Sequence, residues 1–277
     1  METLLDSEML KQYDDETNEY IRKKNIQKLF NVIVKNVLLN KPENVYLYIY
    51  KNIYSFLLNK IYIYGPPLLK ITSTVSSTIA NTFDYYHLNS SNIIQEYCSS
   101  GINDVEDNST DKKIISEDLI SFVIQKKIDE LDAKKKRGYV IEGFPSTNLQ
   151  ALSCLHQLPT HVFVLYTDKE YIYKKYEEET GNKLSIETTK DDFENHTELF
   201  ESKEINVNHI KDQVKTYLRN ISGVLEVLGD NKKVINLKSY DEKKLIDYVM
   251  DLVSQNKNEW DSLFDDSTLD KDEQADK

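Results

Sequence analysis

The sequence predicts an α/β fold, in which helices cover both faces of a parallel sheet. Short apolar segments that suit buried strands lie at 60–64, 138–142 and 161–166, and segments of helical character separate them. Such alternation is typical of a parallel sheet with crossover helices. Ligands of these sheets bind beyond the carboxyl ends of the strands. The residues expected to gather there are Gly65, Gly143 and Asp168.

Length and composition narrow the class of protein. With 277 residues, 39% of them hydrophobic, the chain is long enough for one core and a smaller appended module. The formal net charge of −12 argues against a general nucleic-acid binder, because contacts to phosphates need basic patches. No run of about 18 apolar residues occurs, so we expect no membrane span. The N-terminus lacks the features of a signal peptide, and Cys98 and Cys154 have no metal or redox spacing, which predicts a reduced, cytoplasmic protein.

The N-terminal part is predicted to be flexible over 1–17 and to form a helical hairpin over 18–59. Apolar residues recur with helical spacing up to Leu39, Pro42 breaks this helix, and a second helix runs over about 45–58. The stripe of the first helix consists of Ile26, Leu29, Phe30, Ile33, Val34, Val37 and Leu38. The residues available for burial in the second helix are Leu47, Tyr48, Tyr50, Ile53, Tyr54 and Leu57.

A larger domain is predicted over 60–255, and an acidic tail over 256–277. Ser116 suits a helix N-cap, because two acidic residues follow it in the first turn. The expected helices are 73–83, 91–97, 116–134, 169–178, 207–228 and 241–255. The strands expected besides the three above are 85–88 and 233–237. Polar loops are expected at 99–113 and 180–205.

The segment 60–72 has the outline of a phosphate-binding loop with most of its glycines removed. An apolar strand leads into Gly65-Pro-Pro-Leu-Leu-Lys-Ile-Thr72, and a helical segment follows. A working loop needs several glycines so that backbone NH groups can wrap around phosphates without Cβ clashes. Only Gly65 remains here, and Lys70 is the one residue of the loop that is suited to contact a phosphate.

Arginine is scarce along the whole chain. The arginines are Arg22, Arg137 and Arg219, and the other basic residues are lysines. Arginine holds phosphate through two parallel hydrogen bonds, whereas lysine is a more mobile point charge. The chain is therefore poorly equipped to bind a triphosphate tightly.

The segment Gly138-Tyr-Val-Ile-Glu-Gly-Phe-Pro-Ser-Thr-Asn-Leu-Gln-Ala151 resembles a motif of nucleoside monophosphate kinases of the adenylate kinase type. The similarity extends over about 60–255. It implies a P-loop-type five-stranded parallel sheet with two mobile flaps, and ATP and AMP with Mg as cofactors if the protein is active. In the family, the residue matching Gln150 reads the AMP adenine, and an aspartate at the position of Glu142 supports magnesium. The nucleotide-binding residues implied are Gly65, Pro67, Lys70, Thr72, Glu142, Gly143 and Gln150, with Lys70 as the catalytic candidate.

The departures from the family pattern remove positive charge. Arginines that bind phosphate in the family are matched here by Gln95, Ser146, Lys175, Glu179 and Gln213. The segment that resembles the lid, 180–204, has more acidic than basic residues. Phosphoryl transfer depends on positioning and on charge neutralisation, and the loss of one such arginine can cost on the order of a thousandfold in rate. The resemblance and its departures together predict a weak or inactive enzyme.

The hairpin at 18–59 resembles the dimerisation-and-docking segment of protein kinase A regulatory subunits. It also resembles the segment before the kinase domain in some flagellar adenylate kinases. The resemblance implies a homodimer through 18–59, a groove for an amphipathic helix, and association with the cytoskeleton or a flagellum. The alternative is that the hairpin packs on its own domain, since any apolar stripe must be buried somewhere.

Two functional hypotheses follow. The first is an adenylate kinase-like protein, catalytically weak or inactive, that acts as a dimerisation, docking or nucleotide-sensing module. The alternative is an active kinase that uses Lys70 to transfer phosphate from ATP to AMP or a related nucleotide. We expect no separate metal site and no nucleic-acid or membrane partner. In the tail, Trp260, Leu263 and Phe264 have i, i+3, i+4 spacing, which suits either a partner-binding helix or a segment that folds back on the protein.

Overall fold

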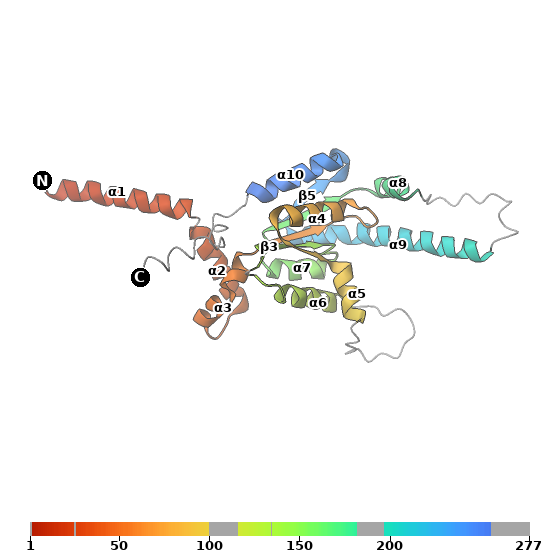
Figure 1. Ribbon diagram of the computed structural model, residues 1–277, viewed down its shortest axis with the longest axis horizontal. Coiled ribbons are helices and arrows are strands. Elements are labelled where there is room, and N and C mark those ends of the chain that lie inside the picture. Colours follow the sequence, from red (N-terminus) through yellow and green to blue (C-terminus); the bar gives the residue numbers. More distant parts are fainter. Residues whose placement is uncertain (1, 25, 100–115, 134, 182–196, 256–277) are drawn as a thin grey trace. The chain divides into compact units, whose positions relative to one another are not determined.

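The computed structural model describes residues 2–24, 26–99, 116–133, 135–181 and 197–255. The chain divides into two compact units. Among the described residues, the first unit comprises 2–24, 26–58, 132–133, 135–137 and 251–255, and the second comprises 59–99, 116–131, 138–181 and 197–250. Figure 1 shows the helices and strands of both units.

The second unit contains a five-stranded parallel sheet with the strand order β2-β3-β1-β4-β5. The predicted α/β class with a parallel sheet is therefore confirmed. All six residues of β1 are buried, which agrees with a central strand covered on both faces. The strands are β1 (Asn59–Tyr64), β2 (Tyr86–Asn89), β3 (Gly138–Glu142), β4 (His161–Tyr166) and β5 (Lys233–Asn236).

Helices cover both faces of this sheet. Helix α4 (Ile71–Phe83) packs against β1, β2 and β3, and α6 (Glu117–Asp129) and α7 (Asn148–His156) lie on the opposite face (Figure 1). Helix α9 (Thr197–Leu228) packs against α7. The remaining elements are α5 (Ser90–Ser99), α8 (Lys169–Thr180), the 3-10 helix η2 (Leu237–Ser239) and α10 (Glu242–Gln255). No helix in the described ranges is long and apolar enough to cross a membrane.

The first unit contains the predicted hairpin, formed by α2 (Ile26–Asn40) and α3 (Val45–Leu57). Asn44 caps α3, because its side-chain oxygen accepts a hydrogen bond from the backbone NH of Leu47 at 2.9 Å. A further helix, α1 (Glu2–Lys23), precedes the hairpin.

Two helices differ from the sequence-based expectations, and a third lies in a segment expected to be flexible. Residues 2–17 belong to α1, whose 22 residues include neither glycine nor proline and end in Arg22 and Lys23, which suit the helix dipole. The flexibility expected for 1–17 stays a prediction. Helix α9 begins at Thr197, ten residues before the expected start. The nine-residue α7 was not expected, because its sequence is too short to show a clear helical period.

The expected N-cap of α6 is confirmed, since the Ser116 hydroxyl accepts a hydrogen bond from the backbone NH of Leu119 at 3.3 Å. The polar loop expected at 99–113 lies outside the described residues except for Ser99, which ends α5. Most of the lid-like segment 180–204 also lies outside them.

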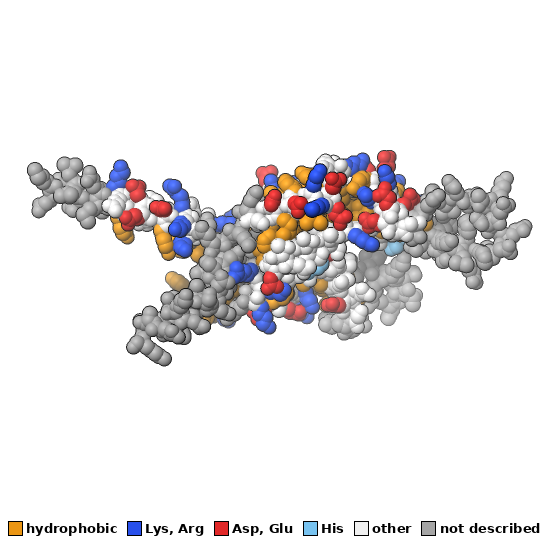
Figure 2. Space-filling view, turned by 45° about the horizontal axis from the view of Figure 1, so that its top comes forward, with side chains coloured by type: hydrophobic (Ala, Val, Ile, Leu, Met, Phe, Trp, Pro, Cys, Tyr) orange, Lys and Arg blue, Asp and Glu red, His pale blue; other side chains and the backbone are white. Residues whose placement is uncertain are grey.

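On the described part of the face in Figure 2, acidic and basic side chains are interspersed over the second unit. No basic patch of the kind that contacts nucleic acid gathers on that part of the face.

Candidate functional site

A cleft of about 820 Å³ opens at the carboxyl ends of β1 and β3. The loops that follow these two strands form part of its wall, and α9 contributes side chains from His209 to Asn220. Ligands bind at this edge in parallel α/β sheets. The cleft is therefore the candidate functional site of the second unit.

The loop after β1 approaches α4 closely at Gly65. A Cβ atom at this position would lie 2.2 Å from Oγ1 of Thr72, so only glycine fits here. The Thr72 side chain is buried, and its hydroxyl has no hydrogen-bond partner among the described residues. Farther along the loop, Leu68 has φ 72°, in the left-handed region that favours glycine, and the Leu69 side chain is buried. The outline of a phosphate loop is kept, with leucines in place of open backbone.

We predict that Gly65→Ala lowers the free energy of unfolding by about 1 to 3 kcal/mol, because the new methyl group collides with the Thr72 hydroxyl. Thr72→Ala in the same chain should restore most of the loss, since it removes the colliding atom. Urea unfolding of the wild type, both single variants and the double variant measures this coupling. Equal losses in Gly65→Ala with and without Thr72→Ala would show that this contact does not select glycine.

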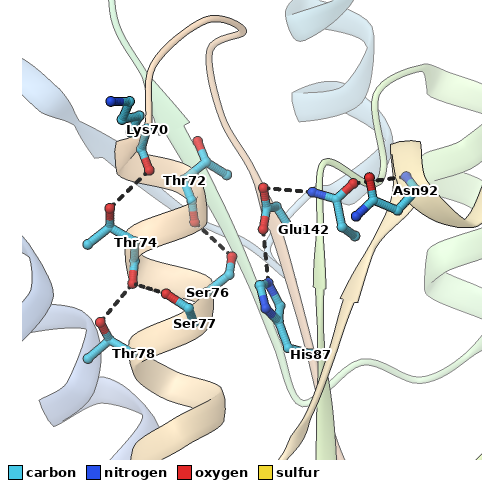
Figure 3. Close-up of polar contacts among 10 residues, drawn as sticks. Lys70, Thr72, Thr74, Ser76, Ser77, Thr78, His87, Asn92 and Glu142 are labelled. Carbon is cyan, nitrogen blue, oxygen red and sulfur yellow. Dashed lines mark hydrogen bonds and ion pairs between the residues drawn. The ribbon is translucent and has the colours of Figure 1, made fainter. Parts of the chain in front are cut away.

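Lys70, the catalytic candidate, does not line the cleft. Its side chain is exposed, and in Figure 3 it points away from Glu142. Lys70 is the N-cap residue directly before α4 and has helical dihedral angles. Its backbone carbonyl accepts hydrogen bonds from the amide and the hydroxyl of Thr74 at 2.9 and 3.1 Å. The side chain therefore holds no phosphate-binding position in this arrangement.

Glu142, at the end of β3, is occupied by neighbours from β2. One carboxylate oxygen lies 2.9 Å from Nε2 of His87, and the other accepts a hydrogen bond from Nδ2 of Asn89 at 3.0 Å (Figure 3). The side-chain oxygen of Asn89 in turn accepts a hydrogen bond from the backbone NH of Asn92 at 3.1 Å. Both oxygens of Glu142 thus have partners within the protein, where the family resemblance implies support of a magnesium ion.

The side chain of Gln150 bonds to Ser146, the residue that replaces an arginine of the family. Its Oε1 atom accepts hydrogen bonds from the backbone NH and the hydroxyl of Ser146, both at 2.8 Å, and the side chain is almost fully buried. Thr147, which follows Ser146, caps α7, and its hydroxyl donates a hydrogen bond to the carboxylate of Glu117 at 2.8 Å. The carboxamide oxygen that would read an adenine is therefore used to fix the turn after β3.

The charge of the cleft is negative. Glu117, Glu142 and Asp212 line it, and Arg219 is the one lysine or arginine among its described lining residues. Like charges repel strongly at short range when the medium between them is partly protein. The cleft therefore disfavours a phosphate chain.

Two tyrosines of the cleft connect β1 to α9: Tyr64 is the last residue of β1, and Tyr217 lies in α9. The rings of Tyr64 and Tyr217 lie 5.5 Å apart between centroids, and the Tyr217 hydroxyl donates to the backbone carbonyl of Leu165 at 2.9 Å. Burial raises the pKa of both tyrosines above the ordinary value. Both hydroxyls therefore stay neutral at physiological pH, and this wall supplies no charge.

The other positions that match family arginines carry no free positive charge toward the cleft. Gln95 lines a separate surface pocket, and Lys175 forms an ion pair with Glu178 at 2.9 Å. Glu179 and Lys175 both line a smaller pocket of about 190 Å³ beside Leu69. Gln213 lines the cleft as a neutral side chain, 3.2 Å from His209.

Asp168, expected at the cleft, has another role. Its carboxylate accepts a hydrogen bond from the backbone NH of Tyr171 at 2.9 Å, which caps α8, and it pairs with Lys238. The hydrogen bond from Lys238 lowers the pKa of Asp168. Asp168 is not among the described residues that line the cleft.

These residues do not fit a magnesium–nucleotide complex. Glu142 is engaged by His87 and Asn89, Lys70 points away, and Leu69 fills part of the loop. Magnesium in kinases is held by one or two carboxylates together with the phosphates of the nucleotide, and both sets of contacts are compromised here. The cleft is therefore not arranged for phosphoryl transfer.

The structure gathers most of the sequence-predicted site residues. Those that line the cleft are Gly65, Pro67, Thr72, Glu142, Gly143 and Gln150. Sequence reasoning did not identify Glu117, Thr147 and Asp212 as parts of the wall. Thr147 caps α7, but because that helix was not expected, its N-cap position gave no signal in the sequence.

Comparisons with known proteins agree with this reading of the cleft. A family model described as "Inactive adenylate kinase_N" matches residues 1–57. A curated protein from Plasmodium falciparum (isolate 3D7), named "Inactive adenylate kinase", is 56% identical over 262 residues, which are 95% of this chain and 98% of that protein. Among solved structures, a gluconokinase from Sinorhizobium meliloti 1021 has 9% identity and a TM-score of 0.44, over 72% of this chain and 93% of that chain. That structural likeness is too distant to bear on chemistry.

Proposed function

Because this chain belongs to the family of inactive adenylate kinases, we propose that it is a catalytically inactive protein that assembles with a second copy of itself through its N-terminal hairpin. The kinase-like unit then serves as a folded body attached to the hairpin. Of the docking and nucleotide-sensing roles expected from the sequence, docking has the stronger support, because the cleft disfavours phosphates.

The charge balance of the cleft carries the first half of this proposal. Glu117, Glu142 and Asp212 face a single Arg219 among the described lining residues. The charge on a transferred phosphoryl group is neutralised in kinases by several cations at once, and an arginine alone contributes on the order of a thousandfold. A cleft with this balance does not support transfer at a useful rate.

A coupled assay for ADP formation from ATP and AMP tests the inactivity. We expect no turnover above the background, and no rise in melting temperature when ATP or AMP is added, because a ligand stabilises only the state that binds it. Turnover of about 10 s⁻¹, which is typical of enzymes, would overturn the proposal. Lys70→Ala would then separate a kinase that uses this lysine from one that does not.

The outer stripe of α2, defined as Phe30, Val34 and Leu38, supports assembly with a second copy. These side chains are 60%, 51% and 65% exposed, while the polar Asn36 is the buried residue of the same helix. The side-chain amide of Asn36 donates to the backbone carbonyl of Val32 at 2.8 Å, within the same helix. A contiguous exposed apolar stripe marks an interaction surface. Sedimentation of the full chain, with the expectation of a dimer, measures this assembly.

The hairpin resembles the segment before the kinase domain in some flagellar adenylate kinases. This resemblance supports a location in the cytoplasm, in association with the cytoskeleton or a flagellum. We propose this location on sequence grounds. Imaging of the tagged full chain tests it, and a signal confined to another compartment would contradict it.

A further inference from the structure

A second exposed surface of the hairpin lies on α3 and differs from the outer stripe of α2. This tyrosine face, defined as Tyr46, Leu47 and Tyr50, occupies the first two turns of the helix. Its side chains are 88%, 47% and 82% exposed. The opposite side of α3 carries Tyr48 and the buried Phe56, whose ring centroids lie 5.5 Å apart, and α3 packs against α2. Tyrosine contributes large contact areas at low entropic cost, so a face of this kind suits the docking of a helix.

The charge of the hairpin is opposite to that of the whole chain. The hairpin of α2 and α3, residues 26–57, carries four basic side chains against one acidic side chain, a net charge of +3 in a protein with a net charge of −12. Two of these lysines, Lys41 and Lys51, are exposed close in sequence to the tyrosine face. A basic surface with aromatic side chains favours an acidic amphipathic partner.

The C-terminal segment of the same chain has this chemistry. Residues 256–277 carry eight acidic and three basic side chains, a net charge of −5. Within it, Trp260, Leu263 and Phe264 have the i, i+3, i+4 spacing of an apolar helix face, and Asp261 and Asp265 flank them.

A short tether joins this segment to the unit that contains the hairpin. The last residues of α10, 251–255, belong to the same compact unit as the hairpin. Trp260 follows Gln255 by five residues, and an extended chain covers about 3.3 to 3.6 Å per residue, or roughly 17 Å here. A short tether gives a high effective concentration, so even a weak contact is populated.

We propose that the acidic segment 259–266 docks on the tyrosine face of its own hairpin, with Trp260, Leu263 and Phe264 against Tyr46 and Tyr50. This inference deepens the proposed docking role of the hairpin and rests on it. The outer stripe of α2 stays available to the second copy, whereas the tail covers the tyrosine face.

The fluorescence of Trp260 tests the proposal directly, because it is the single tryptophan of the chain. In the full-length wild type, we expect emission at shorter wavelength than free tryptophan, and protection from a neutral quencher. Tyr46→Ala with Tyr50→Ala should shift the emission to the wavelength of free tryptophan. About 1 M salt should act in the same direction, since it shortens the Debye length to about 3 Å.

Phe122→Ala is the matched control, because it removes an exposed aromatic side chain from α6 in the other unit. Its emission should equal that of the wild type. An unchanged emission in the tyrosine variant, or an equal shift in the control, would overturn the proposal. Emission that depends on protein concentration would do so as well, because it would place the tail on a second copy. If the protein sediments as a monomer while Trp260 is protected from the quencher, the proposed dimer is wrong and the proposed contact of the tail is supported.

Discussion

Replacing Val34 and Leu38 with aspartate should convert the protein from a dimer into a monomer. Both side chains lie on the outer stripe of α2 and are more than half exposed in the single chain. In a symmetric dimer each substitution counts twice, so four carboxylates would enter an apolar interface. Burying such groups without partners costs several kcal/mol, and about 4 kcal/mol corresponds to roughly a thousandfold in the dissociation constant. Sedimentation equilibrium over a range of concentrations measures the change.

The control for this pair is Leu149→Asp with Leu152→Asp on α7. These leucines are also exposed, but they belong to the other unit. We expect this variant to sediment as the wild type does. Circular dichroism should show the same helix content in both variants, because each substitution is on an exposed face. A dimer that survives in the α2 variant, or dissociates equally in the α7 variant, would place the interface elsewhere.

The sheet could be predicted from the sequence because its signals are local. The segment 60–64 is mostly apolar, which predicts a strand buried on both faces, and every residue of β1 is buried. Gly143 has φ 78° at the end of β3, a conformation for which glycine is the natural residue. Ser116 caps α6 with the hydrogen bond that its position predicts.

The partners of the site residues could not be predicted in the same way. Whether Glu142 faces a metal ion or His87 depends on the pairing of β2 with β3, which sequence spacing does not fix. The turn of Gln150 toward Ser146 likewise depends on how the loop after β3 folds back on α7. Residue types identified the cleft, and tertiary contacts decided what those residues do there.

The hairpin shows a related limit. Helical spacing predicted an apolar stripe on α2, and it included both Ile33, which faces inward in part, and Val34, which is exposed. An apolar stripe that is too wide to be buried by one neighbouring element needs a second partner, but helical spacing alone does not identify that partner. Its assignment to a second copy rests on the exposure of the outer stripe.

Lys60→Met should raise the free energy of unfolding at pH 7 by about 2 kcal/mol. The Lys60 side chain is buried, and Nζ donates to the backbone carbonyl of Gln157 at 2.9 Å. Burial lowers the pKa of Lys60 from 10.5 to about 8, an effect that the charge of Asp129 opposes. One pKa unit corresponds to about 1.4 kcal/mol, so the charged lysine costs roughly 3 kcal/mol at pH 7. Methionine removes this cost and loses one hydrogen bond, which is worth about 1 kcal/mol.

The advantage of the methionine should shrink as the pH rises from 8 to 10. In this window the folded wild type has released the Lys60 proton and the unfolded chain still holds it, so the stability of the wild type increases with pH. Above pH 10, ionisation of buried tyrosines such as Tyr62 and Tyr139, whose pKa values burial raises, weakens both proteins alike. Urea unfolding of both proteins at pH 7 and pH 10 measures the difference. The control is Lys215→Met, on the exposed side of α9, which should change the free energy of unfolding by less than about 0.5 kcal/mol at either pH. If the gain in stability from Lys60→Met did not vary with pH, the buried charge would not be its cause.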